Sequence, residues 1–511
     1  MMSAAQLIDI RSKLQLLAAS LRREADARRD TWGGSPSRRA ARLAWRNLAH
    51  YLALRRHDLR DLQRALMPWG LSSIGRCESR VMPSIAALLA AVDRILQSES
   101  EAVGIAGADS KAAGDLGGSA PAPWPSPRSF FRGERGLARN TRTVFGGGNG
   151  GRGVRVMVTL PESCATDRDV AIALIAAGMD CARINCAHGD AAQWRAMAAY
   201  VRRAAVKVRR PCKILMDLGG PRVRTALLQA AEDRPLVRGD ALRLCEVMPA
   251  GSGASAIPLM QIIPAGWLKM VAPGSTVCID EGKLRVEVVG VDAGGADTIV
   301  IETPPDGRRL RPEKGVNFPG TRLPLGPLTD KDLEDLDVVA QEADLVGYSF
   351  VHDVADVQRL DQELHRRGAR ERVGIVLKIE TERALQNLPD LIMASMALRP
   401  TAVMIARGDL AIEVGYERLA ELQEELLWLC EAAHTPVIWA TQVLERLVKK
   451  GSRSRAEVTD AAMGVRAECV MLNKGPNVLA GVRILDDVLR RMQAHQQKKT
   501  PTLRALRAWE R

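Results

Sequence analysis

The strongest constraint on the fold is a repeated alternation of strand-like and helix-like segments after residue 153. Eight short runs rich in β-branched and other apolar residues are separated, with one longer interruption, by segments that have the period of an amphipathic helix. The runs end at or near Thr159, Asn185, Asp217, Ser349, Glu380, Asp409, Thr441 and Asn473. Alternating β and α segments are typical of a parallel sheet, and eight βα units can close on themselves. We therefore predict an α/β protein with a (β/α)8 TIM barrel formed by residues 151–225 and 324–511.

The long interruption follows the third run and covers residues 226–323. It contains alternating stretches such as STVCIDEGKLRVEVVGV and ADTIVIETP. Alternation with a period of two is typical of strands that bury one face. Because the third run should end at the catalytic rim of the barrel, we predict a small inserted β-barrel-like domain that can act as a lid.

The first 150 residues have a different pattern of apolar residues. Apolar residues recur at three- and four-residue spacing through residues 1–100, with breakers at 33–36 and 68–70, which predicts an α-helical extension. Residues 101–150 include two stretches rich in Gly, Ala, Ser and Pro, and we predict a flexible linker there. The apolar stripes of the helices need burial, and we favour a bundle packed on itself or on the barrel over a partner-binding site.

The net charge of +13 is concentrated in this extension. Residues 1–150 hold 23 Lys and Arg against 13 Asp and Glu, so they carry +10 of the total. A basic segment can bind nucleic acid or an acidic partner. No nucleic-acid motif or set of interleaved aromatic residues accompanies the charge, so we expect solvated helical faces and no role in nucleic-acid binding.

Hydropathy and cysteine usage indicate a cytoplasmic protein without membrane association. Hydrophobic residues make up 46% and charged residues 26% of the chain, and no uninterrupted apolar run reaches the roughly 20 residues of a membrane span. The N-terminus has no basic start followed by an apolar block, so it does not resemble a secretory signal. The nine cysteines form no CxxC pair or Cys/His cluster, as expected of buried thiols in a reducing compartment.

Polar residues gather at the carboxyl ends of the predicted strands, where such a barrel carries its active site. Glu380 and Asp409 end neighbouring strands and offer hard oxygen ligands for Mg²⁺. Lys378 lies two residues before Glu380, so both side chains face the same side of the strand. An ammonium group beside a metal ion stabilises charge on a phosphoryl group or an enolate. Gly408 allows the backbone to approach an anionic ligand, and Arg183 can bind a phosphate through parallel hydrogen bonds.

These residues lie in segments that resemble the pyruvate kinase family. The matching segments follow the family's order and spacing: GMDCARINCAHGD, MDLGGPRVRT, KGVNFPG, LTDKDLEDL, VLKIET, MIARGDLAIEV, PVIWATQVLE and SRAEVTDA. Because many separate blocks agree, the match is more specific than a single motif. The resemblance implies phosphoryl transfer from phosphoenolpyruvate to ADP, the step of glycolysis that yields pyruvate and ATP. It also implies Mg²⁺ as the cofactor, with Mn²⁺ as an alternative, and a homo-oligomer.

The resemblance assigns roles to individual residues. Lys378 resembles the phosphoryl-transfer lysine, and Glu380 and Asp409 resemble the divalent-metal ligands. Thr441 resembles the threonine that helps to protonate the enolpyruvate carbon, and Arg183 resembles the phosphate-contacting arginine. Gly408 joins Lys378, Asp409, Thr441 and Arg183 on the substrate side, whereas the expected nucleotide side comprises His188, Arg224, Asn185 and Lys314, the last supplied by the inserted domain.

The potassium site of the family is altered in this chain. The family takes side-chain oxygens from an Asn-x-Ser segment and an Asp-Thr pair. Asn185 and Asp217 remain, but Ala187 and Leu218 occupy the Ser and Thr positions. Arg222 replaces the glutamate of a Lys-Gly-Pro-Glu block and can place a fixed positive charge where a monovalent cation would bind. We therefore predict a remnant cation site at Asn185, Asp217 and Arg222, and activity that does not depend on K⁺.

Other departures leave the substrate open. The family's Thr-Ile-Gly-Pro loop is shortened to Thr159-Leu160-Pro161, His352 replaces an arginine, and Leu-Ser-Gly-Glu-Thr is replaced by Leu472-Asn473-Lys474-Gly475-Pro476. These changes could alter the choice of nucleotide or acceptor, or could reflect a rebuilt loop. We also expect the family's C-terminal regulatory domain to be missing, because only residues 474–511 follow the eighth strand.

Two alternative functions remain at this point. The first is a lyase or aldolase that stabilises an enolate, but it would have no use for the nucleotide-side residues and the lid. The second is a non-catalytic regulatory homologue, against which the joint retention of Lys378, Glu380, Asp409 and Thr441 argues.

Overall fold

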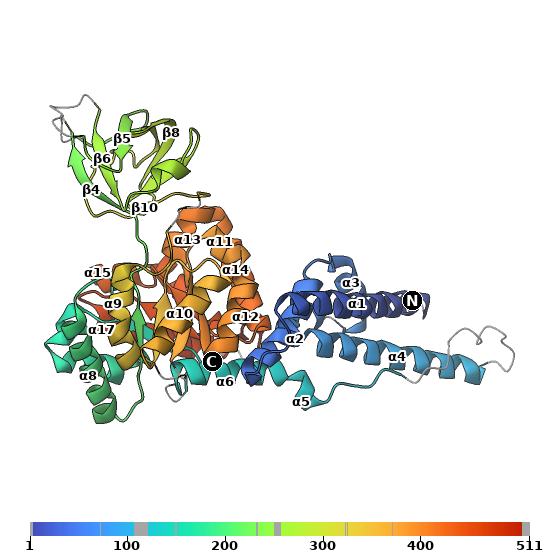
Figure 1. Cartoon of the computed structure of the whole chain (residues 1–511). Helices are drawn as coiled ribbons and strands as arrows, with labels where there is room; N and C mark the ends of the chain where they lie inside the picture. Colours follow the sequence, from blue (N-terminus) through green and yellow to red (C-terminus); the bar gives the residue numbers. More distant parts are fainter. Residues whose placement is uncertain are drawn as a thin grey trace.

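The structure is a computed structural model that describes residues 4–71, 73–106, 121–148, 151–230, 234–249, 257–321, 323, 325–369, 371 and 373–502. Figure 1 shows three parts: a central barrel surrounded by helices, a β domain standing over one end of the barrel, and a bundle of long helices at its side.

Eight parallel strands close into a barrel in the order β1-β15-β14-β13-β12-β11-β3-β2. Nearly every strand residue is buried, because helices cover the outer face and side chains fill the interior. The predicted (β/α)8 fold is therefore confirmed. The strands are β1 (Arg155–Thr159), β2 (Cys181–Asn185), β3 (Lys213–Asp217), β11 (Leu345–Tyr348), β12 (Gly374–Ile379), β13 (Thr401–Ala406), β14 (Val437–Ala440) and β15 (Cys469–Leu472).

The helices of the barrel begin at local signals in the sequence. Asp190 accepts a hydrogen bond from the Gln193 N–H at the start of α8, and Thr329 and Asp332 form a reciprocal capping box at the start of α9. The outer helices are α7 (Arg168–Ala177), α8 (Ala191–Val208), α9 (Asp330–Glu342), α10 (Val354–Arg366), α12 (Leu388–Leu398), α14 (Tyr416–Ala432), α16 (Arg455–Met463) and α17 (Val478–Met492). Shorter helices follow three strands: α11 (Glu382–Gln386), α13 (Arg407–Val414) and α15 (Glu445–Lys450).

The inserted segment forms a separate seven-stranded sheet with the order β10-β7-β8-β9-β5-β6-β4. Alternate residues of these strands are buried and form a separate hydrophobic core, which includes Leu242, Ile262, Val286 and Val300. The sheet begins at Arg224, two residues inside the segment that we assigned to the barrel. Its strands are β4 (Arg224–Gln229), β5 (Ala241–Cys245), β6 (Leu259–Ile263), β7 (Thr276–Ile279), β8 (Leu284–Asp292), β9 (Gly295–Glu302) and β10 (Val316–Asn317).

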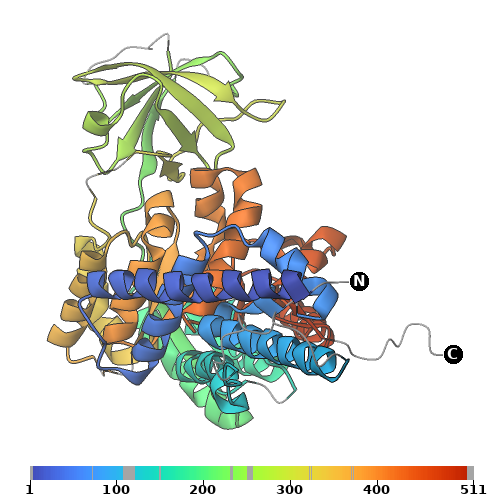
Figure 2. The same ribbon diagram turned by 90° about the vertical axis from the view of Figure 1, so that its right-hand side faces the viewer.

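The N-terminal extension is a helical bundle that packs on itself and on the barrel. The apolar stripes of α1 (Ala4–Thr31), α2 (Arg39–Leu54) and α4 (Val81–Ala106) face one another, and α3 (Arg60–Leu66) packs beside them. The bundle also contacts α12 and α14. Figures 1 and 2 show it on one side of the barrel. Arg28 and the Trp32 indole both donate hydrogen bonds to Asp390, and the Asn47 amide donates to the Ala432 carbonyl.

The prediction of a linker at residues 101–150 is wrong for α5 (Pro127–Phe130) and α6 (Arg132–Phe145). The prediction rested on the two Gly-rich stretches on either side of these helices and was extended across them. Within α6, Gly133 serves close packing. A Cβ on Gly133 would lie 1.9 Å from the Ser79 carbonyl oxygen, and one on Gly136 would lie 3.6 Å from the ring of the buried His434. Residues 107–120, also within the predicted linker, lie outside the described part of the chain.

The end of α6 closes the floor of the barrel. Val144 and Phe145 are 1% exposed and belong to the same apolar cluster as Met157, Leu215 and Val376, whose side chains fill the barrel interior. Packing of this kind leaves little space for rearrangement. Helix α6 is therefore joined to the core of the barrel.

Phe145→Ala should lower the free energy of unfolding of the barrel by about 3–5 kcal/mol, because it removes a buried aromatic ring and leaves a cavity. Urea denaturation followed by circular dichroism measures this loss. Val206→Ala, at a position that is 79% exposed on α8, serves as the control. If both variants unfold at the wild-type urea concentration, Phe145 does not support the barrel floor.

One described segment, Glu78–Glu99, is long and apolar enough to cross a membrane by length and composition alone. It includes most of α4, and charged residues interrupt its apolar positions. Ile85, Leu88 and Val92 on this segment are buried in the same core cluster as the other helices of the bundle. Core helices of globular bundles pass the same test of length and composition.

Candidate active site

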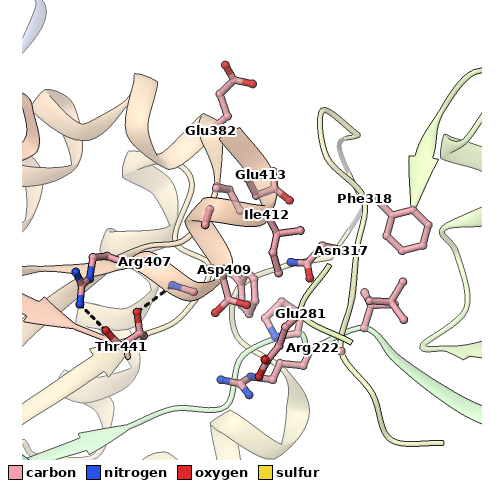
Figure 3. Close-up of a pocket in the computed structure, with 18 of the residues that line it drawn as sticks. Arg222, Glu281, Asn317, Phe318, Glu382, Arg407, Asp409, Ile412, Glu413 and Thr441 are labelled. Carbon is pink, nitrogen blue, oxygen red and sulfur yellow. Dashed lines mark hydrogen bonds between the residues drawn. The ribbon is translucent and has the colours of Figure 1, made fainter. Parts of the chain in front are cut away.

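A cavity of about 1390 Å³ lies between the carboxyl ends of the barrel strands and the inserted domain. Figure 3 shows carboxylates from α13 on one wall, with Arg222 and residues of the inserted domain opposite them. Nine residues predicted from the sequence line this cavity: Arg183, Asn185, His188, Arg222, Arg224, Lys314, Gly408, Asp409 and Thr441. The other three, Asp217, Lys378 and Glu380, are buried next to this lining.

Lys378 is the centre of a buried network. Its Nζ lies 3.0 Å from Glu380 Oε1 and 3.4 Å from Asp217 Oδ1, and it donates a 2.6 Å hydrogen bond to Ser349 Oγ. Lys378 is 4% exposed and both carboxylates are 1% exposed. Burial makes each charge costly unless it is paired, so the three charged groups depend on one another. Ser349, whose hydroxyl donates to the Leu218 carbonyl, was not predicted as a site residue, although it ends a predicted strand.

Glu380 directly follows strand β12, whereas Asp409, which we predicted at the end of a strand, lies in the first turn of α13 after strand β13 ends at Ala406. Pairing of β12 with β13 places Ile379 opposite Ile405, so Glu380 and the start of α13 follow at the same level. Burial raises the pKa of Glu380, the adjacent Lys378 opposes the rise, and Asp409 adds to it. The Phe350 N–H also donates a 2.7 Å hydrogen bond to Glu380 Oε2. Glu380 and Asp409 form a donor set suited to Mg²⁺, which often binds one or two carboxylates and keeps waters.

Arg183 donates two hydrogen bonds to a single carboxylate oxygen of Asp217 beside the cavity. Arg183 Nε and Nη2 lie 2.8 and 2.5 Å from Asp217 Oδ2, and Nη1 donates to Thr159 Oγ1 at 2.9 Å. Burial by itself raises the pKa of Asp217, but Lys378, Arg183 and Arg222 together hold it below its usual value. Asp217 is thus surrounded by protein cations. Among the described residues, Arg222 has no ion-pair partner, so its charge is open to the cavity.

Thr441 is held in an unusual backbone conformation. Its φ is +63°, in the left-handed region that β-branched residues rarely adopt, and its Oγ1 accepts a 3.0 Å hydrogen bond from the Gly408 N–H (Figure 3). Arg407 donates to the Ala440 carbonyl at 2.8 Å and to the Thr441 carbonyl at 2.6 Å. It is ion-paired with Asp460 on α16, where Nη2 lies 2.9 Å from Oδ2. Arg407 and Asp460 therefore act as positioning residues for Thr441, a role that the sequence analysis missed.

Asp460→Asn should lower kcat for turnover by about tenfold, because Arg407 loses its anchor and Thr441 can shift by a fraction of an ångström. The KM for the substrate should change by less than about twofold, because Asp460 is not expected to bind it directly. Steady-state kinetics separate the two parameters. Asp487→Asn, at an exposed ion pair with Arg491 on α17, is the matched control. A rise in KM with unchanged kcat would contradict a positioning role.

The side of the cavity next to the inserted domain carries cations together with carboxylates such as Asp280 and Glu281. Lys314 Nζ lies 3.8 Å from Asp280 Oδ1, and the Lys314 N–H donates to Thr225 Oγ1 at the start of the insert. Desolvation lowers the pKa of His188, and Lys474, Arg224 and Arg222 lower it further. The predicted nucleotide-side residues therefore lie close together in space, and Lys474 joins them.

Glu413 is one of several carboxyl groups of the cavity that were not predicted. It lies on α13 near Asp409 and Glu382 (Figure 3). Burial raises its pKa to about 7, and both neighbouring carboxylates contribute to the rise. Glu413 lies four residues after Asp409, so the two side chains share a face only if the segment is a helix. The sequence analysis placed Asp409 at the end of a strand and therefore did not predict that Glu413 lies beside it.

Comparison with known sequences assigns this barrel to a family. The family model described as the barrel domain of pyruvate kinase matches residues 152–476. The chain belongs to the pyruvate kinase family. The resemblance inferred from the sequence motifs is thereby confirmed, and the matched region contains every predicted site residue as well as Arg407 and Asp460.

Curated pyruvate kinases match the same region at moderate identity. A pyruvate kinase of Agrobacterium vitis is 32% identical over 332 residues, which cover 63% of this chain and 66% of the relative. One of Mycobacterium intracellulare is 30% identical over 342 residues, which cover 66% of this chain and 69% of the relative. One of Thermotoga maritima is 29% identical over 322 residues, covering 62% and 66%. The chain thus spans about two thirds of the length of the curated relatives that it matches.

Proposed function

We propose that the protein catalyses phosphoryl transfer from phosphoenolpyruvate to ADP, which gives pyruvate and ATP. The observation that carries this proposal is the buried Lys378 between Glu380 and Asp217. It lies beside a cavity lined by Asp409 and Glu413 on one wall, and by Arg222, Arg224 and Lys314 together with Asp280 and Glu281 on the other. Phosphoryl transfer depends on positioning and on stabilising charge, and this arrangement serves both requirements. A lyase would not need the cations contributed by the inserted domain.

Glu380 and Asp409 would hold the divalent ion, Mg²⁺ or Mn²⁺. When bound, the ion would neutralise charge on the enolate and phosphoryl oxygens. The buried position of Glu380 and the hydrogen bond that it accepts from Phe350 fix one carboxylate before any ligand arrives. Preorganised ligands of this kind need no rearrangement during turnover.

Each of the active-site side chains would have its own role in the reaction. Lys378, oriented by Ser349 and two carboxylates, would donate hydrogen bonds to the transferred phosphoryl group. An oxygen of the ADP β-phosphate would attack phosphorus as the bond to the enol oxygen breaks, leaving the enolate of pyruvate. Arg183 would contact the phosphate of the donor. Thr441, which already receives a hydrogen bond from Gly408, would help to deliver a proton to the methylene carbon, which completes pyruvate.

We further propose that turnover is independent of K⁺. Lys378 and Arg183 lower the pKa of Asp217 most, and the guanidinium of Arg222 adds to the lowering, so Arg222 contributes a fixed positive charge near that carboxylate. We expect equal rates of pyruvate formation in sodium and potassium salts at the same ionic strength. Arg222→Gln removes the fixed charge and should make the rate lower and sensitive to K⁺. Strict dependence of the wild-type enzyme on K⁺ would refute this part of the proposal.

A cytoplasmic location fits the cysteines of the chain. All nine cysteines lie in described segments, and all are buried free thiols, as is usual in a reducing compartment. The proposed substrates are also metabolites of that compartment. Fractionation of cells into cytoplasmic and membrane pools, followed by immunoblotting, tests this location.

A further inference from the structure

Lys474 follows the eighth barrel strand and lines the active-site cavity. Its Nζ lies 2.9 Å from Glu162 Oε1, in the loop that follows the first strand. The Lys474 side chain is 37% exposed and the Glu162 side chain 70% exposed. The ion pair therefore links the first and eighth loops of the barrel at the surface of the cavity, in the segment that departs from the family pattern.

The backbone that carries Lys474 is tightly fixed, although its side chain is accessible. A Cβ on Gly475 would lie 2.7 Å from both the side chain and the carbonyl oxygen of Val448, so this position requires glycine. The Asn477 N–H donates to the Val448 carbonyl at 3.0 Å, and the Lys474 N–H donates to Asn473 Oδ1 at 2.9 Å. The loop presents the ammonium group from a rigid base, so a change of partner needs only side-chain rotation.

The position of Lys474 relative to other cations indicates what it binds. Lys474, Arg224 and Arg222 all lie close enough to His188 to add to the lowering of its pKa, after desolvation. Mutual repulsion among these groups is relieved when a multiply charged anion enters. A nucleoside diphosphate, the acceptor in the proposed function, has the required charge in its two phosphates.

The ion pair between Lys474 and Glu162 is weak enough for another anion to replace Glu162. Exposed ion pairs have a small net stability because water and salt screen them, and because two long side chains must be ordered. A diphosphate offers several oxygens and a larger charge than one carboxylate, so it competes well for the ammonium group. Glu162 would then form the ion pair with Lys474 only while no acceptor is bound.

We propose that Lys474 binds the diphosphate of the nucleotide acceptor and that Glu162 competes with the nucleotide for it. This inference rests on the proposed function, because it takes ADP as the acceptor. It assigns a specificity role to a lysine at a position where the family pattern has none. Glu162 sets the strength of the competition, so the pair tunes the affinity for the acceptor.

The two partners of the pair should have opposite effects on ADP affinity. Lys474→Met should raise the Kd for ADP about tenfold, because one charge-assisted contact is lost. Glu162→Gln should lower the Kd by about two- to threefold, because the competitor is removed. The double variant should behave as Lys474→Met alone. A purely structural ion pair would instead make both single variants weaker, by similar amounts.

Titration calorimetry with ADP and Mg²⁺ at low ionic strength tests the inference without requiring turnover. Adenosine, which lacks phosphates, should show no difference among the variants, and Lys13→Met at an exposed pair on α1 should leave ADP binding unchanged. Shifts in the same direction, no shift, or no binding of ADP to the wild-type protein would overturn the inference. Opposite shifts in a protein that forms no pyruvate would support the inference and reject the proposed reaction.

Discussion

Lys378→Ala should lower kcat for pyruvate formation by about 1000-fold. Lys378 supplies a fixed ammonium group beside Glu380, and loss of one preorganised donor to a developing anion typically costs about 100- to 1000-fold in rate. The same change leaves Glu380 and Asp217 buried without their shared cation, which costs about 3–5 kcal/mol of stability. The assay is therefore run beside a denaturation curve recorded with and without Mg²⁺, so that unfolding is not mistaken for lost catalysis.

Lys213→Ala is the matched control for this variant. Lys213 starts strand β3 at the opposite end of the barrel, where its Nζ lies 3.2 Å from Asp344 Oδ1. Its loss should leave kcat within about twofold of the wild type, because surface ion pairs contribute little. A folded Lys378→Ala protein with nearly full activity would remove Lys378 from the mechanism.

Glu380→Gln should weaken the binding of Mn²⁺ by at least about 100-fold. The substitution keeps the size of the side chain and an oxygen that can accept from the Phe350 N–H, but it removes the charge of the proposed metal ligand. Changes in groups that merely support a metal ligand already cost about 10- to 100-fold in affinity, so loss of the ligand itself should cost more. Electron paramagnetic resonance of free Mn²⁺ measures the affinity without any need for turnover.

Glu382→Gln provides the comparison for the metal site. Glu382 lines the same cavity, but it lies on α11 with Arg418 3.6 Å away and is not expected to bind the ion. Its Mn²⁺ affinity should match that of the wild type. Equal Mn²⁺ binding by the Glu380→Gln and wild-type proteins would show that the ion binds elsewhere.

The barrel and most of its site could be predicted because both follow from local pattern. Each strand is a continuous apolar run, since it is buried on both faces, and each run stops where the side chains turn polar at the rim. Lys378 and Glu380 alternate along one strand, so their shared face follows from the period of two. The positions of these residues at the cavity therefore needed no knowledge of distant contacts.

The parts that sequence reasoning missed depend on contacts between distant segments. Arg407 and Asp460 are 53 residues apart, and Lys474 and Glu162 are 312 apart. Neither pair leaves a periodic signal in the sequence. Helix α6 was missed because the linker prediction, based on the Gly-rich stretches on either side of it, was extended across residues 132–145. Its Gly133 is required by contact with the backbone at Ser79. Glycine has low helix propensity, but tertiary packing overrides it here.

The extension uses part of its positive charge to dock on the barrel. Arg28 pairs with Asp390 at 2.8 Å, and Arg55 lies over the Trp428 ring at 5.0 Å. The buried His434 donates through Nε2 to the Ser79 carbonyl, and burial lowers its pKa to about 4, so this contact uses the neutral ring. These contacts join the bundle to helices whose preceding or following strands end at the active site.

Phosphorus NMR of the purified protein with phosphoenolpyruvate, ADP and Mg²⁺ tests the central claim most directly. We predict that the phosphoenolpyruvate signal falls as the three ATP signals rise, with one pyruvate formed for each ATP. Sodium and potassium buffers should give the same time course. Release of inorganic phosphate without ATP, or no reaction while Mn²⁺ still binds, would contradict the assignment of this barrel as a phosphotransferase acting on ADP.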